Sequence, residues 1–366
     1  MNVASALLAG NDARPGLAVA ALSQALEKIG QRPANGVLLF LSAEFARQAQ
    51  LTVTAVARAA RCTQVVGGIA AGVFTHRGWV LDRPAVALMV FADDLSLTFG
   101  ETGEPRMGPI LSYSGSRFPP AWAMDRTRFG GCFAGQAEPV AWQNSRLREE
   151  CSVQVRGGEV EVGVSLAWRF LGEGHTVDCS RAHELIRVGG KPAFDSLMAD
   201  LAGHCDPPPS LTVLAAVLID ADAAAIASEL LKAGQRPVAI VERRADGSLI
   251  LAEHMRVGQR LAWAMRSPSA ARADMRRCVA RLAEAAPEPV AALLFSCIGR
   301  GPCFHDGEDC EVDCLRERFP ELPLIGCYGT GQIAPSPVAG NQLLQNAVVT
   351  ALISPLTRRS DVQPEP

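Results

Sequence analysis

Gly36–Ser42 reads GVLLFLS, and Ala291–Cys297 reads AALLFSC. Within them, Gly36–Leu41 and Ala291–Phe295 are short, continuous apolar runs, which are typical of strands buried on both faces. A segment with helical spacing follows each run, Ala43–Ala60 in the first case and Cys310–Phe319 in the second. Strands that alternate with helices indicate parallel strands joined by crossovers. These two stretches therefore predict an α/β fold, and a mixed α+β arrangement stays possible.

Glycine-containing strands extend the parallel between the two halves. Val65–Gly72 reads VVGGIAAG, Leu324–Gly331 reads LIGCYGTG, and a third copy, FGGCFAG, occupies Phe129–Gly135. Glycine after an apolar strand permits positive φ and close backbone approach, which serves either a ligand pocket or tight packing. The matched order of elements predicts two related halves from an internal duplication, with mixed sheets covered by helices.

A proline-rich segment divides the chain. Asp206–Ser210 reads DPPPS, the clearest linker signal in the sequence. We therefore expect an N-terminal domain over residues 1–205, a linker over 206–210, a C-terminal domain over 211–355 and a disordered tail over 356–366. Further expectations are an exposed loop over Glu101–Pro120, a helix over Ala221–Ala233 and a hairpin around Asp246.

Composition excludes several classes of protein. The 366 residues carry a net charge of −3 without a basic stripe, which argues against nucleic-acid binding. The apolar runs are too short to span a membrane. The first ten residues lack the basic start of a signal peptide, and the eleven cysteines are an odd number. We therefore expect reduced thiols and a cytoplasmic location.

Two longer stretches resemble a known family. Val290–Gly301 reads VAALLFSCIGRG and Pro323–Pro335 reads PLIGCYGTGQIAP, and together they closely resemble the signature of the FIST C-terminal domain. The glycine strands of the N-terminal half, with His183–Arg187, resemble the FIST N-terminal domain. The resemblance extends from about Ala4 to about Leu352.

The resemblance implies a sensory module that binds a small-molecule ligand, such as an amino acid or another carboxylate metabolite. It also implies a separate signalling partner, such as a histidine kinase, and some members are reported to bind haem. The chain departs from the family pattern at one place. Gly331-Gln332-Ile333-Ala334 stands where the family usually carries Gly-Glu-Ile-Gly, so an amide replaces a carboxylate. If relatives use that carboxylate for a cationic group, the ligand here differs.

A candidate ligand site lies where the two signature strands end. Successive glycine amides form an anion-binding nest, and an arginine offers a planar fork to a carboxylate or phosphate. Alternatively, Arg300 pairs with a structural carboxylate and Cys297 packs as a small apolar residue. The candidate residues are Ser296, Cys297, Gly299, Arg300, Gly301, Gly326, Gly331 and Gln332.

Cysteines and a histidine crowd the same region and leave two alternatives open. Thiolate and imidazole ligands suit zinc or an iron–sulfur cluster, and a histidine could hold haem, although no Cys-x-x-Cys-His motif is present. The candidate metal ligands are Cys297, Cys303, His305, Cys310 and Cys314. Cys297 could instead be the nucleophile of a hydrolase or transferase with His305 nearby. Without a local catalytic signature, we assign no catalytic residue.

Overall fold

The computed structural model describes residues 2–99, 108–115, 117–133, 141–205, 207–219, 237–336 and 340–356. Contacts divide the chain into two compact units. The larger unit contains Met1–Ser165 and Met275–Pro366, and the smaller one contains Leu166–Asp274. The smaller unit is thus an insertion in the sequence of the larger one.

The larger unit contains three six-stranded sheets that repeat one strand order. The first sheet has the order β1-β6-β2-β3-β10-β11, the middle sheet β7-β12-β8-β9-β24-β25, and the third sheet β13-β26-β22-β23-β4-β5. In every sheet the two central strands run parallel, as β2–β3, β8–β9 and β22–β23. On one side of each parallel pair lies an antiparallel strand: β6 pairs with β2, β12 pairs with β8, and β26 pairs with β22. Sheets of mixed direction therefore confirm the predicted α/β class.

The bounds of these strands are as follows. The first sheet contains β1 (Val3–Ala9), β6 (Ala85–Phe91), β2 (Gly36–Ser42), β3 (Val65–Ala70), β10 (Ala141–Gln143) and β11 (Arg146–Arg148). The middle sheet contains β7 (Ser96–Thr98), β12 (Glu150–Arg156), β8 (Ile110–Ser114), β9 (Arg128–Cys132), β24 (Gly331–Pro335) and β25 (Asn341–Leu344). The third sheet contains β13 (Gly158–Leu166), β26 (Ala347–Pro355), β22 (Ala291–Cys297), β23 (Leu324–Gly329), β4 (Gly72–Thr75) and β5 (Gly78–Leu81).

Exchanged hairpins join the three sheets in a cycle. The hairpin after β3, formed by β4 and β5, pairs with β23 of the third sheet. The hairpin after β23, formed by β24 and β25, pairs with β9 of the middle sheet. The hairpin after β9, formed by β10 and β11, pairs with β3 of the first sheet. Each sheet therefore needs a hairpin from another part of the chain to be complete.

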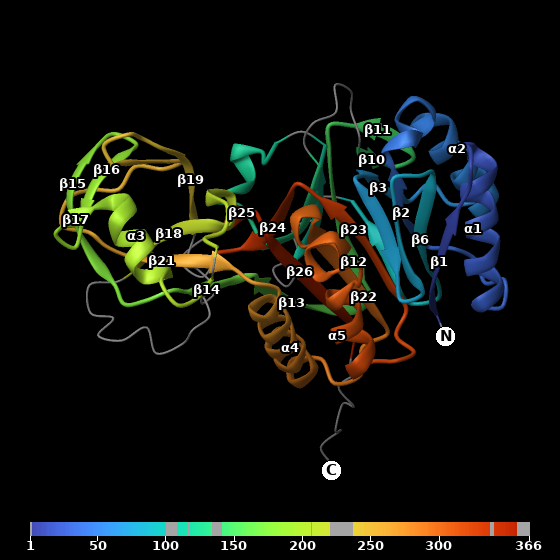
Figure 1. The fold of residues 1–366 in the computed structure, drawn as a ribbon. Coiled ribbons are helices and arrows are strands. Elements are labelled where there is room, and N and C mark those ends of the chain that lie inside the picture. The colour runs from blue at the N-terminus through green and yellow to red at the C-terminus, as the bar shows by residue number, and fades with distance from the viewer. Residues whose placement is uncertain are drawn as a thin grey trace, which may run out of the picture. The chain divides into compact units, whose positions relative to one another are not determined.

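Helices cover two of the sheets. The first sheet packs against α1 (Pro15–Lys28), η1 (Ala43–Gln48) and α2 (Ala49–Ala60). The third sheet packs against α4 (Pro268–Ala285) and α5 (Cys310–Arg318), near η4 (Ile298–Arg300) and η5 (Pro302–His305). Figure 1 shows both helix pairs on their sheets. The apolar faces of the helices supply the burial that stabilises them.

Aromatic rings from the three parallel pairs meet inside the larger unit. Phe40 of β2 lies 5.5 Å from Tyr113 of β8 and 5.8 Å from Phe295 of β22, measured between ring centroids. The pairing registers give these residues equivalent positions, because they lie opposite Gly68, Gly131 and Cys327. Small residues opposite the rings leave room for them, so the glycine pattern serves packing here.

The smaller unit is an antiparallel sheet that closes on itself, since β18 pairs with both β19 and β21. Its strands are β14 (Trp168–Phe170), β15 (His175–Arg181), β16 (Glu184–Val188), β17 (Lys191–Pro192), β18 (Leu214–Ile219), β19 (Pro237–Arg243), β20 (Leu249–Leu251) and β21 (Arg260–Arg266). Helix α3 (Ala193–Leu201) contributes to its core, and Ser196 accepts a hydrogen bond from the Trp263 indole. The remaining short helices are η2 (Pro120–Trp122) and η3 (Leu211–Val213).

Several expectations need correction or stay open. The duplication into two halves is not confirmed, because the repeated strand order occurs in three interlocked sheets. The expected loop over Glu101–Pro120 contains strand β8, whose polar serines obscured its pattern. The expected helix over Ala221–Ala233 lies outside the described residues, as does the tail from residue 357 onward. The hairpin around Asp246 is present as β19 and β20. The predicted domain boundaries differ from those of the compact units and stay a prediction.

Candidate functional site

The predicted ligand segment begins at the end of β22. Cys297 lies opposite Gly329 of the parallel strand β23, and the chain then turns through Ile298–Gly301. Gly301 packs on the Tyr328 ring, where an added β-carbon would lie 3.4 Å from a ring carbon. The segment is therefore held against β23, as the order of strands in the sequence suggested.

Arg300 lies at the centre of a buried polar cluster. Its side chain is 0% exposed. Nε donates to Glu311 Oε1 at 2.9 Å and Nη2 donates to the same oxygen at 2.6 Å. Nη1 donates to the Ser165 carbonyl oxygen at 2.7 Å. All three guanidinium nitrogens are thus engaged, which matches the structural alternative for Arg300. A direct ligand role for Arg300 stays a prediction that requires this ion pair to open.

The acidic side of the cluster organises the start of α5. His305 Nε2 lies 3.2 Å from Glu311 Oε1. Asp309 caps the helix by accepting hydrogen bonds from the backbone amides of Glu311 and Val312, and its other oxygen accepts one from the Tyr328 hydroxyl. Burial raises the pKa of Asp309 to about 6. The cluster therefore contains a carboxyl group that titrates near neutral pH.

Gln332 also lies in the interior. It is fully buried and pairs with Gly131, on the face of the middle sheet that carries Tyr113. Neither its amide nitrogen nor its amide oxygen has a hydrogen-bond partner among the described residues. The predicted site residues therefore occupy the interior of the larger unit rather than a shared open pocket.

The five candidate metal ligands do not converge. Among the described residues, no group of three or more His, Cys, Asp or Glu side chains could hold a metal ion. Cys303 is exposed, whereas Cys297 is buried at the strand end and His305 contacts Glu311. The pKa of Cys314 is raised by its hydrogen bond with Cys310 and by burial. Among the described residues, the arrangement therefore offers no group of three ligands for zinc or an iron–sulfur cluster, and a haem-binding histidine stays a prediction.

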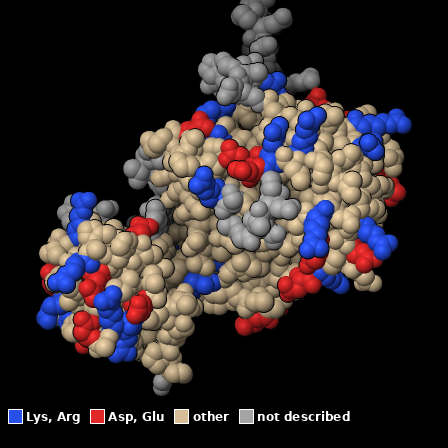
Figure 2. All heavy atoms as spheres, turned by 90° about the horizontal axis from the view of Figure 1, so that it is seen from above, with Lys and Arg blue, Asp and Glu red and all other residues tan. Residues whose placement is uncertain are grey.

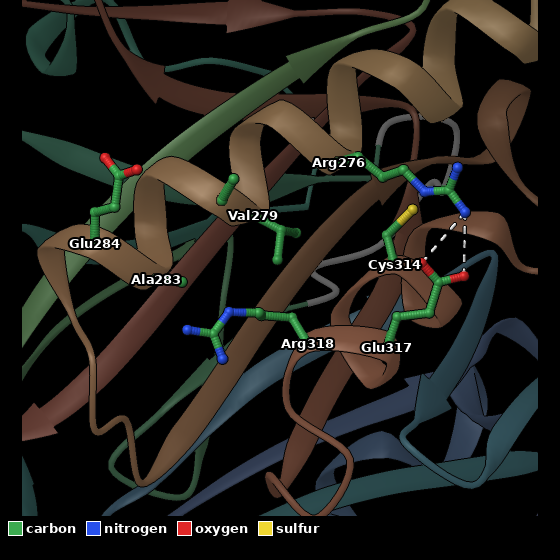
Figure 3. A pocket seen from close by; sticks show the side chains of 8 residues that line it. Arg276, Val279, Ala283, Glu284, Cys314, Glu317 and Arg318 are labelled. Carbon is green, nitrogen blue, oxygen red and sulfur yellow. Dashed lines mark hydrogen bonds and ion pairs between the residues drawn. The ribbon is translucent and has the colours of Figure 1, made fainter.

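A surface groove of about 420 Å³ runs between α4 and α5 (Figure 3). Val279, Ala283 and Cys314 contribute apolar lining. Arg276 Nη2 lies 3.3 Å from Glu317 across the groove, and both side chains are exposed. Exposed pairs of this kind contribute little to stability, because solvent screens their charges. The groove has no buried polar group that would orient a ligand.

The outer face of the middle sheet differs from the outer faces of the other two. This face carries the polar set Ser112, Ser114, Arg128, Ser152 and Gln154. The pairing registers place Arg128 where the first sheet has Val65 and the third sheet has Leu324. Ser112 likewise stands where the other sheets have Leu39 and Leu294, both of which pack in the helix-covered cores.

Arg128 is the charged centre of this face and is 7% exposed. Its Nη1 donates to Ser112 Oγ at 2.9 Å and to Ser152 Oγ at 2.8 Å. Nη2 forms an ion pair with Asp125, and the buried Nε has no partner among the described residues. The guanidinium lies 4.7 Å from the centroid of the Trp122 ring. A buried charge is costly unless it is paired and hydrogen-bonded, and Asp125 and the two serines supply these partners to Arg128.

A loop carrying η2 covers Arg128 and is attached to the middle sheet by Asn341 of β25. The Asn341 side-chain nitrogen donates to the backbone oxygens of Trp122 and Arg126 at 2.7 and 3.0 Å. Its side-chain oxygen accepts a hydrogen bond from the Arg128 amide at 2.7 Å. The hydrogen bond and charge of Arg128 lower the pKa of Asp125, whose side chain is 39% exposed. Asp125 is thus a partly exposed carboxylate that pairs with the buried guanidinium of Arg128.

Our sequence analysis missed this site, although a signal was present. An alignment of the three glycine strands places Arg128 in RFGG opposite Val65 in VVGG and Leu324 in LIGC. A charge among apolar equivalents marks a position with a different role. The glycines themselves do not reveal the difference, because all three strands share the first of them.

Comparison with known proteins agrees with the C-terminal resemblance. Residues 211–335 match the FIST C domain. FIST domains are generally linked to sensing and signal transduction. The match begins at the predicted domain start and includes β22, β23 and β24. A match to the FIST N-terminal domain is not shown, so that part of the resemblance stays a prediction.

Two relatives differ in how much of this chain they match. An uncharacterized protein of Mycobacterium tuberculosis (strain CDC 1551 / Oshkosh) is 25% identical over 372 residues, which cover 91% of this chain and 94% of the relative. An uncharacterized protein of Mycobacterium bovis is 33% identical over 99 residues, which cover 27% of this chain and 25% of the relative. The first similarity spans both compact units, and neither relative's description names a ligand.

Two further observations concern the charge on one face of the surface and the hydropathy of the helices. On the face drawn in Figure 2, Lys and Arg side chains are interspersed with Asp and Glu. Within the described residues, no helix has the length and apolar character needed to cross a membrane.

Proposed function

We propose that this chain is a small-ligand-binding sensory protein in signal transduction, and that its ligand carries an anionic group such as a carboxylate. The observation that carries the proposal is Arg128, a buried arginine on a sheet face whose two counterparts are apolar and covered by helices. The match of residues 211–335 to the FIST C domain supports the sensory role. The signal would pass to a separate signalling protein.

On binding, a carboxylate of the ligand would replace the carboxylate of Asp125 on the Arg128 guanidinium. Ser112 and Ser152 orient the guanidinium from the sheet side, and Trp122 covers it with an aromatic ring. A planar guanidinium pairs well with a carboxylate, and an indole ring offers a stacking surface to the rest of a small ligand. Asp125 occupies the position on Nη2 that a ligand carboxylate would take. Displacing Asp125 would alter the loop that carries Trp122, which provides a route from binding to signal.

The test combines native mass spectrometry of the purified chain with calorimetric titration of amino acids and other carboxylic acids. Arg128→Gln is expected to weaken binding by about 2–5 kcal/mol, because it removes the partner of a buried carboxylate. Asp125→Asn should strengthen binding, since it removes the internal competitor. Arg281→Gln, on the exposed face of α4, is the matched control and should bind as the unaltered chain does.

Two results would count against the proposal. Equal affinity in Arg128→Gln and the unaltered chain would show that the ligand lies elsewhere. If no acid in the panel binds and no small molecule copurifies, the sensory role itself loses its support.

A further inference from the structure

Lys28 and His76 both contact Ser5, and the charges of Arg77 and Arg316 act on His76 as well. Lys28 ends α1, and its Nζ donates to the Ser5 carbonyl oxygen of β1 at 2.5 Å. His76 of the β4–β5 turn places Nδ1 3.3 Å from the hydroxyl oxygen of Ser5. Ser5 therefore holds both side chains beside each other. Arg77 continues the turn, and Arg316 comes from α5.

The cluster holds like charges together. Burial lowers the pKa of His76, and the positive charges of Lys28, Arg77 and Arg316 lower it further, whereas Glu321 acts in the opposite direction. Burial and then Arg77 lower the pKa of Lys28. Three permanent positive charges thus act on His76 against the opposing carboxylate of Glu321. These like charges disfavour the protonated form of His76, and a bound anion would favour it.

The four side chains are available to a ligand. Lys28, Arg77 and Arg316 are exposed, and His76 is half-buried. Arg316 has an exposed contact with Asp313, with Nη1 and Oδ1 3.5 Å apart, which is weak enough for an anion to compete with. Lysine offers a point charge, arginine offers a planar fork, and a protonated histidine adds a donor.

We propose that Lys28, His76, Arg77 and Arg316 form a binding site for a phosphate group, as inorganic phosphate or a small phosphate ester. A phosphate carries close to two negative charges and three strongly accepting oxygens. It would therefore neutralise the positive charge that remains beside the carboxylates of Glu321 and Asp313. The site uses residues of the first and third sheets and their helices, and it does not depend on the ligand proposed for Arg128.

Phosphate binding has a direct readout in the titration of His76. The ring protons of His76 are followed by NMR from acid to alkaline pH in the full chain, first in chloride and then in inorganic phosphate at equal ionic strength. The pKa of His76 is expected to rise in phosphate, because the bound anion stabilises the imidazolium. A parallel titration in acetate shows whether any monoanion has the same effect as phosphate. A parallel titration in a small phosphate ester shows whether the site prefers the free ion or the ester.

Variants locate the site. Arg77→Gln is expected to weaken phosphate affinity about tenfold, which corresponds to about 1.4 kcal/mol. It should also raise the pKa of His76 in chloride, because a repulsive neighbour is gone. Lys28→Gln should act in the same direction, and Arg281→Gln should match the unaltered chain. An identical His76 titration in chloride and phosphate would overturn the proposal, as would equal phosphate affinity in Arg77→Gln and Arg281→Gln.

Discussion

Replacing Arg300 with methionine should destabilise the larger unit strongly. The side chain is fully buried, and its three nitrogens donate to Glu311 and Ser165. Without the Arg300 guanidinium, the Oε1 atom of Glu311 keeps only its contact with His305 among the described residues. The Oε2 atom of Glu311 already lacks a partner among the described residues. An uncompensated buried charge costs about 3–5 kcal/mol when its partner is removed. We therefore expect Arg300→Met to lower the free energy of unfolding by that amount.

A double variant separates the charge from the packing. Arg300→Met combined with Glu311→Leu removes both charges, and apolar replacements of buried ion pairs are often neutral or stabilising. The double variant should thus recover most of the loss. Guanidinium denaturation followed by tryptophan fluorescence measures each stability, and an unchanged denaturant slope indicates that the same unit unfolds. The reasoning fails if Arg300→Met stays within about 1 kcal/mol of the unaltered chain, or if the double variant is no more stable than the single one.

Two further predictions concern the cap of α5 and the glycine strands. The pKa of Asp309 is raised from 3.8 to about 6, so folding favours its protonated form. Its stabilising contribution is full below about pH 4 and is lost as pH rises through 6, a change of about 3 kcal/mol. The stability difference between the unaltered chain and Asp309→Asn should follow this trend in denaturation series at pH 4 to 7, and a constant difference would refute it. Gly130 has φ +147°, and an added β-carbon would lie 1.8 Å from the Ser112 carbonyl oxygen. Gly130→Ala should therefore cost at least about 2 kcal/mol in the same assay. Gly16→Ala, at an open position, should change stability by no more than about 1 kcal/mol, and equal effects of the two changes would contradict the packing argument.

Local sequence pattern determined the central elements of the fold. The predicted strands Gly36–Leu41 and Ala291–Phe295 are β2 and β22, which extend one and two residues further, to Ser42 and Cys297. Their burial on both faces follows from continuous apolar composition, and the glycines opposite the aromatic rings follow from the space that packing requires. The resemblance at Val290–Gly301 and Pro323–Pro335 likewise agreed with the FIST C match. These are properties of neighbouring residues, so a linear pattern carries them.

Tertiary structure decided which residues meet. Arg300 stands beside glycines that suggested an anion nest, but the fold places Glu311 and Ser165 on its three nitrogens. The glycine strands align Arg128 with Val65 and Leu324 in the sequence, but only the fold places its guanidinium beside Ser112 and Ser152 of neighbouring strands. The cycle of exchanged hairpins is equally invisible in the linear pattern, since each hairpin pairs with strands far away in the chain. The energy of a buried charge depends on its partners in space, and pairing across the three sheets determines those partners.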